Sequence, residues 1–410
     1  MRGITRDEAK ARYLDIFEDS VRIRTRADVP LGITLSSGID STSIAYTMGR
    51  VFAGESHSFT SSFSAEDTPL MDSTIYSNPV AIDESTIAQD TSKAIGYNHH
   101  VVRTDGEYFK LTLEKIIYHM ESGNSSPAVI PMMQLLGVAR KHVTVFMDGQ
   151  GADELLGGYV LSTVLPAIGD LMAQGRVIEA FKSLREFGKT YKLTYATKMA
   201  LRDLSNDVSF ITLVHQKMSG RSSVYGAALR DYDRWKDFMD RPGEGNSSLL
   251  GKILQRQHSG GLVNLLHYSD AISMANSMEA RMPFLDHRLV EYVWQLPSEY
   301  KVHLGTGKAL HREAMRGLVP DEVLNQKAKL GFTTPIAEWF RSDRFSGDCP
   351  LNVLLEPRSL SRDLFDRASI EKMIREHRCG RKDHATHLFR ILNVELWFRR
   401  FIDAPIQLDD

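Results

Sequence analysis

Three stretches of the chain combine glycine, hydroxyl and charged residues in patterns that suit phosphate chemistry. The first is Ser36-Ser37-Gly38-Ile39-Asp40-Ser41, which lies between an apolar run and an amphipathic segment. The first backbone N–H groups of a helix are unpaired and the helix dipole is positive there, so a bound phosphate is stabilised by both. Gly38 permits close approach of the backbone, and the serines add hydroxyl donors. An ordinary helix N-cap is the alternative interpretation.

Asp40 is the unusual residue of this stretch. A carboxylate beside a phosphate is repulsive unless a cation separates them, and Mg²⁺ is the usual cation. The second stretch, Asp148-Gly149-Gln150-Gly151-Ala152-Asp153-Glu154, again places acids in a glycine turn. If the two turns follow neighbouring strands, Asp40 and Asp153 can share one Mg²⁺ over the pyrophosphate of ATP. Taken alone, the second stretch reads as an acidic turn that caps a helix.

The third stretch places a lysine directly after a glycine turn, in Gly305-Thr306-Gly307-Lys308. A lysine in this position can reach phosphates as a point charge and stabilise a negatively charged transition state. Lys329, in a basic segment at 327–329, is a second candidate for contact with phosphate. A solvated surface lysine is the alternative at both positions.

Composition limits the class of protein. The chain has 410 residues, of which 42% are hydrophobic and 25% charged, as in ordinary soluble globular proteins. Its formal net charge of −2 shows no basic footprint for nucleic acid or an anionic membrane. Two cysteines are too few for a disulfide framework, so we expect a reducing, cytoplasmic setting. The N-terminus is charged and no run is long enough to predict a bilayer span.

Alternating strands and helices predict a parallel, doubly wound α/β sheet. We expect strands before the first loop and at 57–64, 100–103 and 143–147, separated by helices at 41–53, 84–95, 107–120 and 129–141, after a lead-in helix at 6–24. Ligands of such sheets bind at the carboxyl ends of the strands. Residues 66–83 read as a polar loop, and the chain from 160 onward reads as mostly helical.

Other residues receive structural interpretations. His99 and His100 are adjacent on a predicted strand and would point to opposite faces, which does not favour a metal site. Glu279, Arg281 and Asp286 are charges in apolar sequence, and we expect them to be paired and partly buried. Ser273 and Met274 are candidates for substrate contact.

Five motifs in order along residues 10–401 resemble the synthetase domain of asparagine synthetases. The first loop with Leu35 is similar to the S-G-G-x-D-S loop of the PP-loop ATP pyrophosphatases, with Ser37 replacing a glycine. The second stretch is similar to S-G-E-G-x-D-E-x-x-G-G-Y, with Asp148 and Gln150 as departures. The others are the block at 270–286, the segment at 305–312 and the basic segment at 327–335. Because glutamine cannot transfer a proton, Gln150 puts any acid–base role of the family's glutamate in doubt.

The resemblance implies an adenine-nucleotide α-hydrolase-like parallel sheet with a large helical lobe. It divides the chain into an ATP-binding sheet core with its lead-in helix (1–160), a mostly helical part that completes the substrate cleft (161–401) and a tail (402–410). It also implies a set of site residues. They are Lys308, Asp40 and Asp153 for catalysis, Asp40 and Asp153 for Mg²⁺, and Leu35, Ser36, Ser37, Gly38, Asp40, Ser41, Asp148, Gly149 and Lys329 for ATP.

The implied reaction is the formation of an amide with conversion of ATP to AMP and pyrophosphate. A carboxylate, with the aspartate side chain as the first guess, is adenylated and then accepts ammonia. The chain has no cysteine before Cys349, so the family's glutaminase domain is expected to be absent. Ammonia would then be free or come from a separate glutaminase subunit, and a homodimer is compatible with the resemblance.

Two alternatives remain open. One is an amide ligase or cyclase of the β-lactam or lasso-peptide type, in which a substrate amine is the nucleophile. The other is a non-catalytic relative that binds a nucleotide. Neither nucleic acid nor a membrane is an expected partner.

Overall fold

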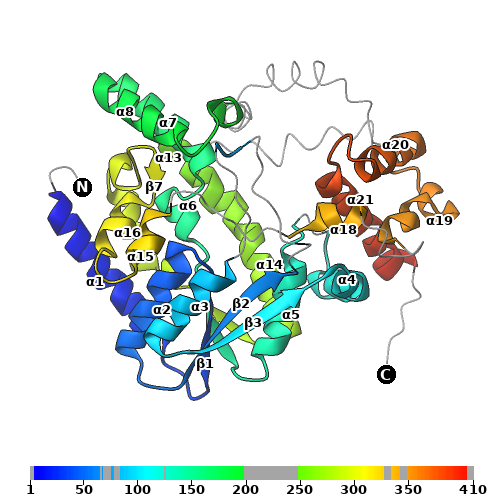
Figure 1. The fold of residues 1–410 in the computed structure, drawn as a ribbon, viewed down its shortest axis with the longest axis horizontal. Helices are drawn as coiled ribbons and strands as arrows, with labels where there is room; N and C mark the ends of the chain where they lie inside the picture. Colours follow the sequence, from blue (N-terminus) through cyan, green and yellow to red (C-terminus); the bar gives the residue numbers. More distant parts are fainter. Residues whose placement is uncertain are drawn as a thin grey trace.

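A five-stranded parallel sheet lies at the centre of the computed structural model, with helices on both faces (Figure 1). The structure describes residues 4–64, 67, 75–77, 84–123, 126–197, 248–326, 334–341 and 349–403. The strands are β1 (Leu31–Thr34), β2 (Ser56–Phe63), β3 (Asn98–Thr104), β4 (Val145–Met147) and β5 (Glu279–Arg281). Their order is β3-β2-β1-β4-β5. The predicted parallel α/β sheet is therefore confirmed.

The strand order reverses between β1 and β4, which pair in parallel with Leu31 opposite Val145. β1 also pairs with β2, with Leu31 opposite Ser56. The first three residues of β1 are buried, as expected for a central strand that helices cover on both faces. In open α/β sheets the point where the order reverses is where ligands bind. The two glycine-containing loops follow β1 and β4, so the sheet brings them to this point.

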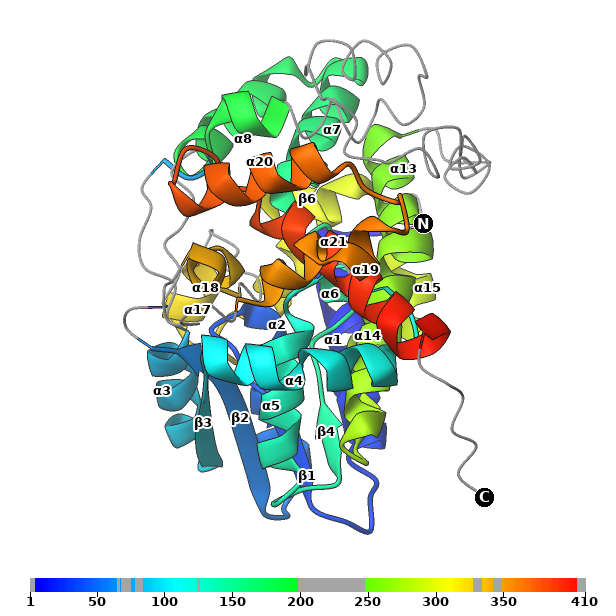
Figure 2. The same ribbon diagram turned by 90° about the vertical axis from the view of Figure 1, so that its right-hand side faces the viewer.

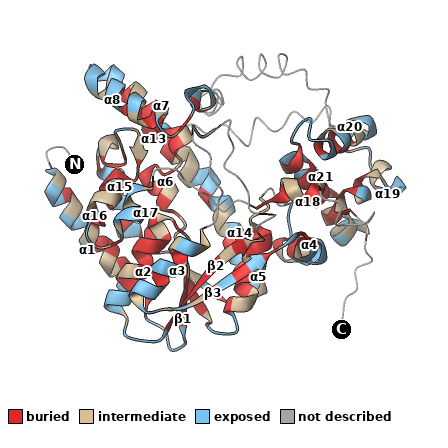
Figure 3. Ribbon diagram, in the orientation of Figure 1, coloured by how far each residue is buried: buried red, intermediate tan, exposed pale blue. Residues whose placement is uncertain are grey.

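One face of the sheet packs against helices from both ends of the chain. These are α1 (Arg6–Arg24), α2 (Ile39–Val51), α3 (Ser85–Ile95), α15 (His287–Gln295) and α16 (Ala309–Ala314). α1 begins with a capping box between Thr5 and Glu8 and buries one apolar stripe that includes Tyr13 and Phe17. Figure 3 shows that buried residues concentrate on the strands and on the helix faces turned toward them.

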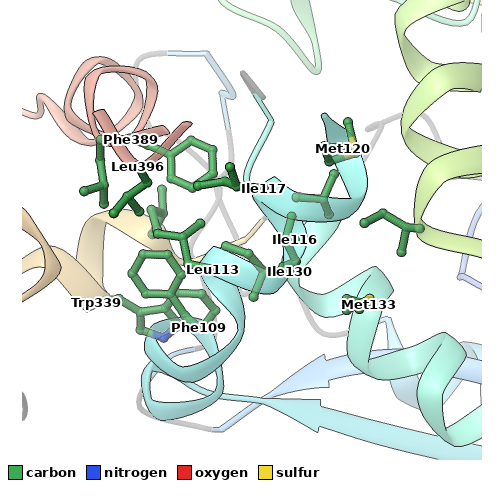
Figure 4. Close-up of a cluster of buried hydrophobic side chains, with 14 of the residues drawn as sticks. Phe109, Leu113, Ile116, Ile117, Met120, Ile130, Met133, Trp339, Phe389 and Leu396 are labelled. Carbon is green, nitrogen blue, oxygen red and sulfur yellow. The ribbon is translucent and has the colours of Figure 1, made fainter. Parts of the chain in front are cut away.

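The opposite face is covered by α4 (Gly106–Met120), α5 (Val129–Ala139) and α14 (Leu262–Ala275), which face the viewer in Figure 2. The core on this side continues into α18 (Ile336–Arg341), α20 (Arg367–Arg378) and α21 (Ala385–Phe398). Figure 4 shows Trp339 of α18 and Phe389 of α21 against the apolar side of α4. The rings of Trp339 and Phe109 stack with centroids 5.6 Å apart. The C-terminal helices therefore share one hydrophobic core with the sheet.

A third cluster joins α7 (Val160–Ala173), α8 (Val177–Gly188) and α13 (Leu249–Arg256), which project from one end of the molecule in Figure 1. The remaining short elements are α6 (Ala152–Leu156), β6 (Val302–His303), β7 (Thr306–Gly307), α17 (Asp321–Asn325) and α19 (Pro357–Leu360), with 3₁₀ turns at Pro283–Leu285, Ser298–Tyr300 and Pro350–Leu355 and π turns at Gln257–Gly261 and Arg399–Asp403.

The four predicted strands and the five predicted helices up to residue 141 are confirmed within a few residues, and the lead-in helix matches at both ends. β5 was not predicted, because three residues that alternate charge and alanine lack the apolar run of a buried strand. The division of the chain at residue 160 stays a prediction. Most of the predicted polar loop at 66–83 lies outside the described residues.

The prediction that no run could span a bilayer needs one correction. Ala152–Ala173 is long and apolar enough by length and composition, with a mean hydropathy of 1.5. Gly157 divides this stretch between α6 and α7, and 61% of its most apolar window is buried inside the protein. Burial of this kind is ordinary for a core helix, so the stretch is weak support for a membrane span.

Candidate active site

The two loops that follow β1 and β4 touch each other at the carboxyl end of the sheet. A Cβ placed on Gly149 would lie 3.1 Å from the Asp40 Cβ and 3.3 Å from the Ser41 backbone nitrogen. The absence of a side chain at Gly149 therefore lets the second loop pack directly on the start of α2. This contact brings Asp40 and Asp153 to one place, as the proposed sharing of a cation requires.

Serine hydroxyls close the first loop on itself. The backbone N–H of Ser36 donates to Ser41 Oγ at 3.1 Å, and that of Gly38 donates to Ser36 Oγ at 3.1 Å. Ser37 is fully buried, and its hydroxyl donates to Glu84 at 3.0 Å. Glu84 lines the cavity but Ser37 itself does not, so the Ser37 hydroxyl is engaged by a neighbouring side chain.

Asp148 holds the second loop in its conformation. Its carboxylate accepts from the Thr34 hydroxyl at 2.7 Å and from the Gln150 backbone N–H at 2.9 Å. Burial raises the pKa of Asp148, and these two hydrogen bonds oppose that rise. Gly151 then turns the chain into α6 with a φ of 90°. Asp148 thus fixes the turn that presents Asp153.

Lys308 lies between the two predicted metal-binding carboxylates. Its Nζ is 2.5 Å from Asp40 Oδ2 and 2.7 Å from Asp153 Oδ1. The three side chains are only 8%, 17% and 14% exposed for Lys308, Asp40 and Asp153. Burial lowers the pKa of Lys308, and the contact with Asp40 works against this shift. The structure therefore brings together all three predicted catalytic residues, from β1–α2, β4–α6 and β7–α16.

The backbone around Lys308 is unusual in a way that fixes its position. Lys308 has a φ of 59°, in the left-handed region that a non-glycine residue rarely adopts, and its N–H donates to the Leu156 carbonyl at 2.9 Å. A Cβ on Gly158 would overlap Asp153 Oδ1 and Lys308 Cε. Such strained positions cluster at functional sites, where the surrounding structure enforces them.

A cavity of about 330 Å³ opens above this triad of side chains. Most predicted site residues line it, namely Leu35, Ser36, Gly38, Asp40, Ser41, Asp148, Gly149, Asp153 and Lys308. Ser37 does not line it, and neither does Ser273 or Met274. Lys329 lies outside the described residues, so its prediction is neither supported nor contradicted by position. The lining also contains Gln150, the departure from the family's glutamate.

The sequence analysis did not predict several residues that line the rest of the cavity. Thr60 and Ser61 on β2 and Met132 and Leu135 on α5 line it together with Tyr159. Thr60 and Ser61 lie near the carboxyl end of a predicted strand, which was a usable signal for the first two. Met132 and Leu135 gave no signal, because an apolar helix predicts only core. An apolar wall beside an anion-binding loop suits a flat base attached to phosphates.

His311 lies three residues after Lys308, on α16, and the sequence suggested no role for it. It is buried among Tyr13, Phe17 and Phe284, and Tyr13 Oη lies 2.9 Å from its Nδ1. Burial lowers the pKa of His311 to about 3, so it stays neutral near neutral pH. A neutral ring here adds no positive charge to compete with Lys308.

The charged block at 279–286 is structural, as predicted. Asp286 is buried and pairs with Arg24 and Arg288 at 3.0 Å each, which holds its pKa well below the usual range. Arg281 donates to the carbonyls of Arg24 and Arg26 at 2.8 Å. Glu279 pairs with Arg281 but is exposed, so the expectation of burial is wrong for this residue.

Asp40 and Asp153 suit a divalent cation by the chemistry of their donors. Both present carboxylate oxygens toward one point, which the Lys308 ammonium occupies, and hard cations such as Mg²⁺ prefer such oxygens. With Lys308 charged, the three groups sum to one negative charge. A net negative, largely buried pair is compatible with a cation that bridges to phosphate oxygens.

A parallel sheet whose order reverses above a glycine loop, with paired acids and a lysine at that point, defines a nucleotide-binding α/β enzyme fold. Comparison with known proteins is more specific. The family model described as asparagine synthase matches residues 12–399. The chain belongs to the asparagine synthase family, and the resemblance seen in the motifs is confirmed.

Individual relatives agree with this assignment. A putative glutamine-hydrolyzing asparagine synthetase of Mycobacterium bovis is 30% identical over 98% of this chain and 60% of its own length. Asparagine synthetase 1 of Bacillus subtilis is 27% identical over 95% of this chain and 59% of its own. The chain thus spans about 60% of the length of these relatives. A protein named amidase chyE, from Penicillium rubens, is 27% identical over 76% of the chain and 51% of its own length.

Among solved structures, an ammonia-dependent NAD synthetase from Campylobacter jejuni matches with 14% identity and a TM-score of 0.24. The match covers 38% of this chain and 61% of that one.

Proposed function

We propose that the protein is an ATP-dependent, AMP-forming and pyrophosphate-forming amide synthetase. The observation that supports this most is the contact of Lys308 with both Asp40 and Asp153, at the junction of the two loops and at the base of the cavity. A site for nucleotide binding alone needs the loop but not a buried lysine held by two acids. The family membership points to carbon–nitrogen bond formation.

In this proposal the loop after β1 binds the phosphates of ATP. The N-terminus of α2, a helix of 13 residues, presents backbone N–H groups from Ile39 onward, whereas the Gly38 N–H donates to Ser36 Oγ. The base lies against Leu35 and the apolar wall that includes Met132. Asp40 and Asp153 would hold Mg²⁺, which would neutralise charge on the pyrophosphate leaving group.

The reaction has two steps. A substrate carboxylate oxygen forms a bond to the α-phosphorus while the bond to pyrophosphate breaks, which gives an acyl-adenylate. A nitrogen nucleophile then attacks the acyl carbon, the carbon–oxygen bond to AMP breaks, and the nitrogen loses a proton. Lys308 stabilises the negative charge that develops on phosphoryl oxygens, since it reaches the cavity as a fixed cation in a largely buried site.

Aspartate is the first carboxylate to test, with ammonia as the nitrogen source. The ammonia would be free or delivered by a separate glutaminase subunit. We place the enzyme in the cytoplasm and propose a homodimer.

The test is isotope exchange between pyrophosphate and ATP with aspartate as the carboxylate, followed by mass spectrometry after addition of ammonium. Exchange that depends on aspartate, with asparagine as the product, supports the proposal. An Asp40→Asn variant controls for contaminating activity and should lose the exchange. Absence of exchange with any carboxylate while Mg·ATP binds would contradict adenylation and favour a non-catalytic nucleotide-binding protein.

A second candidate is an amide ligase or cyclase that uses a substrate amine. Gln150 lines the cavity where the family's motif has glutamate, and a neutral amide cannot transfer a proton. An amine nucleophile on the substrate would remove the need to handle ammonia. Exchange with a larger carboxylate but not with aspartate would favour this candidate.

A further inference from the structure

Three histidines meet at the amino end of the parallel strands, opposite to the carboxyl end where the active site lies. His57 lies near the start of β2, His100 lies on β3, and His142 lies between α5 and β4. One ligand nitrogen from each ring lies within 4.8 Å of the other two. We call these three residues the histidine cluster. No other group of this kind occurs in the part of the chain that the structure describes.

The strand register puts two of the rings on one face. His100 is paired with Phe59, two residues beyond His57, so His57 and His100 share a face. His57 Nδ1 lies 3.1 Å from His100 Nε2. The adjacent His99 points to the other face, where its Nδ1 lies 2.9 Å from Ser58 Oγ. The prediction that His99 and His100 point to opposite faces is thus confirmed. Its conclusion against a metal site considered only this pair, whereas the partners of His100 come from other segments.

The third histidine reaches the pair because the intervening strand has no side chain there. Gly32 of β1 pairs with His57, and a Cβ on Gly32 would lie 2.9 Å from Phe59 Cε2 and 3.0 Å from Val143 Cγ2. The segment before β4 therefore packs close to β2, and the His142 ring lies against that of His100, with centroids 4.1 Å apart and the planes tilted by 33°. Four segments of the fold contribute to this arrangement.

The surroundings suit a cation bound by neutral imidazoles. Burial lowers the pKa of both His57 and His100, which favours the neutral imidazole that a metal ion binds. Glu55 Oε1 lies 3.5 Å from His57 Nε2, on the far side of that ring from His100. This oxygen also accepts from Asn98 Nδ2 at 2.8 Å, so Glu55 adds a nearby negative charge to the cluster. The carboxyl end of α5 just before His142 adds a favourable dipole.

Access and spacing also agree with a metal site. His57 is buried, His100 is half-buried and His142 is exposed, so an ion can enter from solvent at one side. Two nitrogens bound to one tetrahedral Zn²⁺ at its usual bond length lie about 3.3 Å apart, close to the observed separation of His57 and His100. His142 is the exposed member of the cluster, and its ligand nitrogen lies within 4.8 Å of those of the other two.

We propose that the histidine cluster binds one transition-metal ion of the Zn²⁺ class, with solvent or another ligand in the fourth position. Three imidazoles without a carboxylate favour Zn²⁺, Co²⁺, Ni²⁺ or Cu²⁺ over Mg²⁺ or Ca²⁺. The ion ties together β2, β3 and the segment that leads into β4. This site is separate from the one at Asp40 and does not depend on the proposed function.

Co²⁺ is the probe of choice, because its visible absorption reports tetrahedral coordination. The 410-residue chain, stripped of metal by chelator and of any affinity tag by protease, would be titrated with Co²⁺ and then with Zn²⁺. We expect one equivalent of Co²⁺ with a tetrahedral spectrum, displaced by Zn²⁺, and a rise in melting temperature on Zn²⁺ binding. In His142→Asn the affinity should fall at least about tenfold, the scale at which even outer-shell changes act.

Matched variants keep the test specific. His287→Asn removes an exposed histidine outside the cluster, and Cys379→Ser removes the exposed thiol. Both should bind Co²⁺ as the parent does. Because His142 is exposed, its variant should fold, which circular dichroism checks. No stoichiometric Co²⁺ binding, binding unchanged in His142→Asn, or binding lost in a control variant would each overturn the proposal.

Discussion

The carboxyl and amino ends of the parallel strands differ in how their polar residues are assembled. At the carboxyl end, each of three short loops contributes one charged residue, Asp40, Asp153 or Lys308, beside glycines that allow close packing. At the amino end, three segments contribute one histidine each, and none of these segments contains a recognisable motif. The first kind of site leaves a local record in the sequence, and the second does not.

The difference teaches where to look for function in such a fold. Binding of phosphate needs backbone N–H groups and tight turns, so it imposes several neighbouring residue types at once. Binding of a metal by histidines needs only three nitrogens at a suitable distance, and any three segments can supply them. We expect changes at the carboxyl end of the strands to impair the reaction, and changes at the amino end to alter only the stability of the protein.

Removal of the buried ammonium should have the largest effect. In Lys308→Met, adenylation measured by pyrophosphate exchange should fall by about 10²–10³-fold, the scale for losing one preorganised charge donor. Lys189→Met, at an exposed lysine that pairs only with Glu186 in the described residues, should be within twofold of the parent, about the noise of such assays. Equal activity in Lys308→Met would place the chemistry elsewhere in the molecule.

Addition of one methyl group should separate the active-site turn from an ordinary glycine. Gly158→Ala places a Cβ onto Asp153 Oδ1 and Lys308 Cε, so we expect a loss of unfolding free energy of about 1–3 kcal/mol together with a loss of exchange. Gly188→Ala, at the end of α8, meets nothing within 4 Å and should stabilise the protein by about 0.4–1 kcal/mol. Chemical denaturation checks both, and an unaffected Gly158→Ala would contradict the close packing.

A second buried lysine gives a prediction about pH. Lys301 is buried and donates to the Leu296 carbonyl at 2.7 Å, without the paired carboxylates of Lys308, and burial lowers its pKa from 10.5 to about 8. The unfolded state therefore binds more protons between about pH 8 and 10, and this residue makes stability rise with pH there, by up to about 1.4 kcal/mol per unit.

Lys301→Met tests this sign, because it removes the titrating group and keeps the apolar stem. Its unfolding free energy should exceed that of the parent near pH 7.5, and the difference should shrink by pH 9.5. Urea denaturation at the two pH values measures it. A difference that grows with pH would mean that Lys301 is stabilised in its charged form by the fold.

At the amino end of the strands, we expect a smaller effect that is confined to the stability of the fold. Gly32→Ala should cost about 1 kcal/mol or somewhat more, because its Cβ would press on Phe59 and Val143. Gly137→Ala on α5, where the nearest heavy atom lies at 3.4 Å, is the matched control and should be neutral or stabilising. Thermal melts without nucleotide compare the two. A loss of pyrophosphate exchange in folded Gly32→Ala would contradict the idea that the amino end of the strands affects only stability.

Much of the fold was predictable because the chain is locally consistent. Helical periodicity gave α1 at both ends, and buried apolar runs gave β1 and β4. β5 escaped because Glu279-Ala280-Arg281 has no strand pattern of its own and pairs only because β4 offers an edge. Ser37 was expected among the phosphate contacts, but tertiary packing turns its hydroxyl toward Glu84.

The amino-acid sequence by itself determined which loops bear charge, that Asp40, Asp153 and Lys308 belong to one site, and which family the chain joins. It could do so because each loop is a contiguous motif. The residue types of the first two suit phosphate and cation binding, and the resemblance to the family assigned Lys308 to the same site. The tertiary structure decided that Lys308 lies between the two acids, that α5 supplies the apolar wall, and that His57, His100 and His142 meet. Those contacts join residues far apart in the chain, and strand order and register, which no local pattern encodes, set their distances.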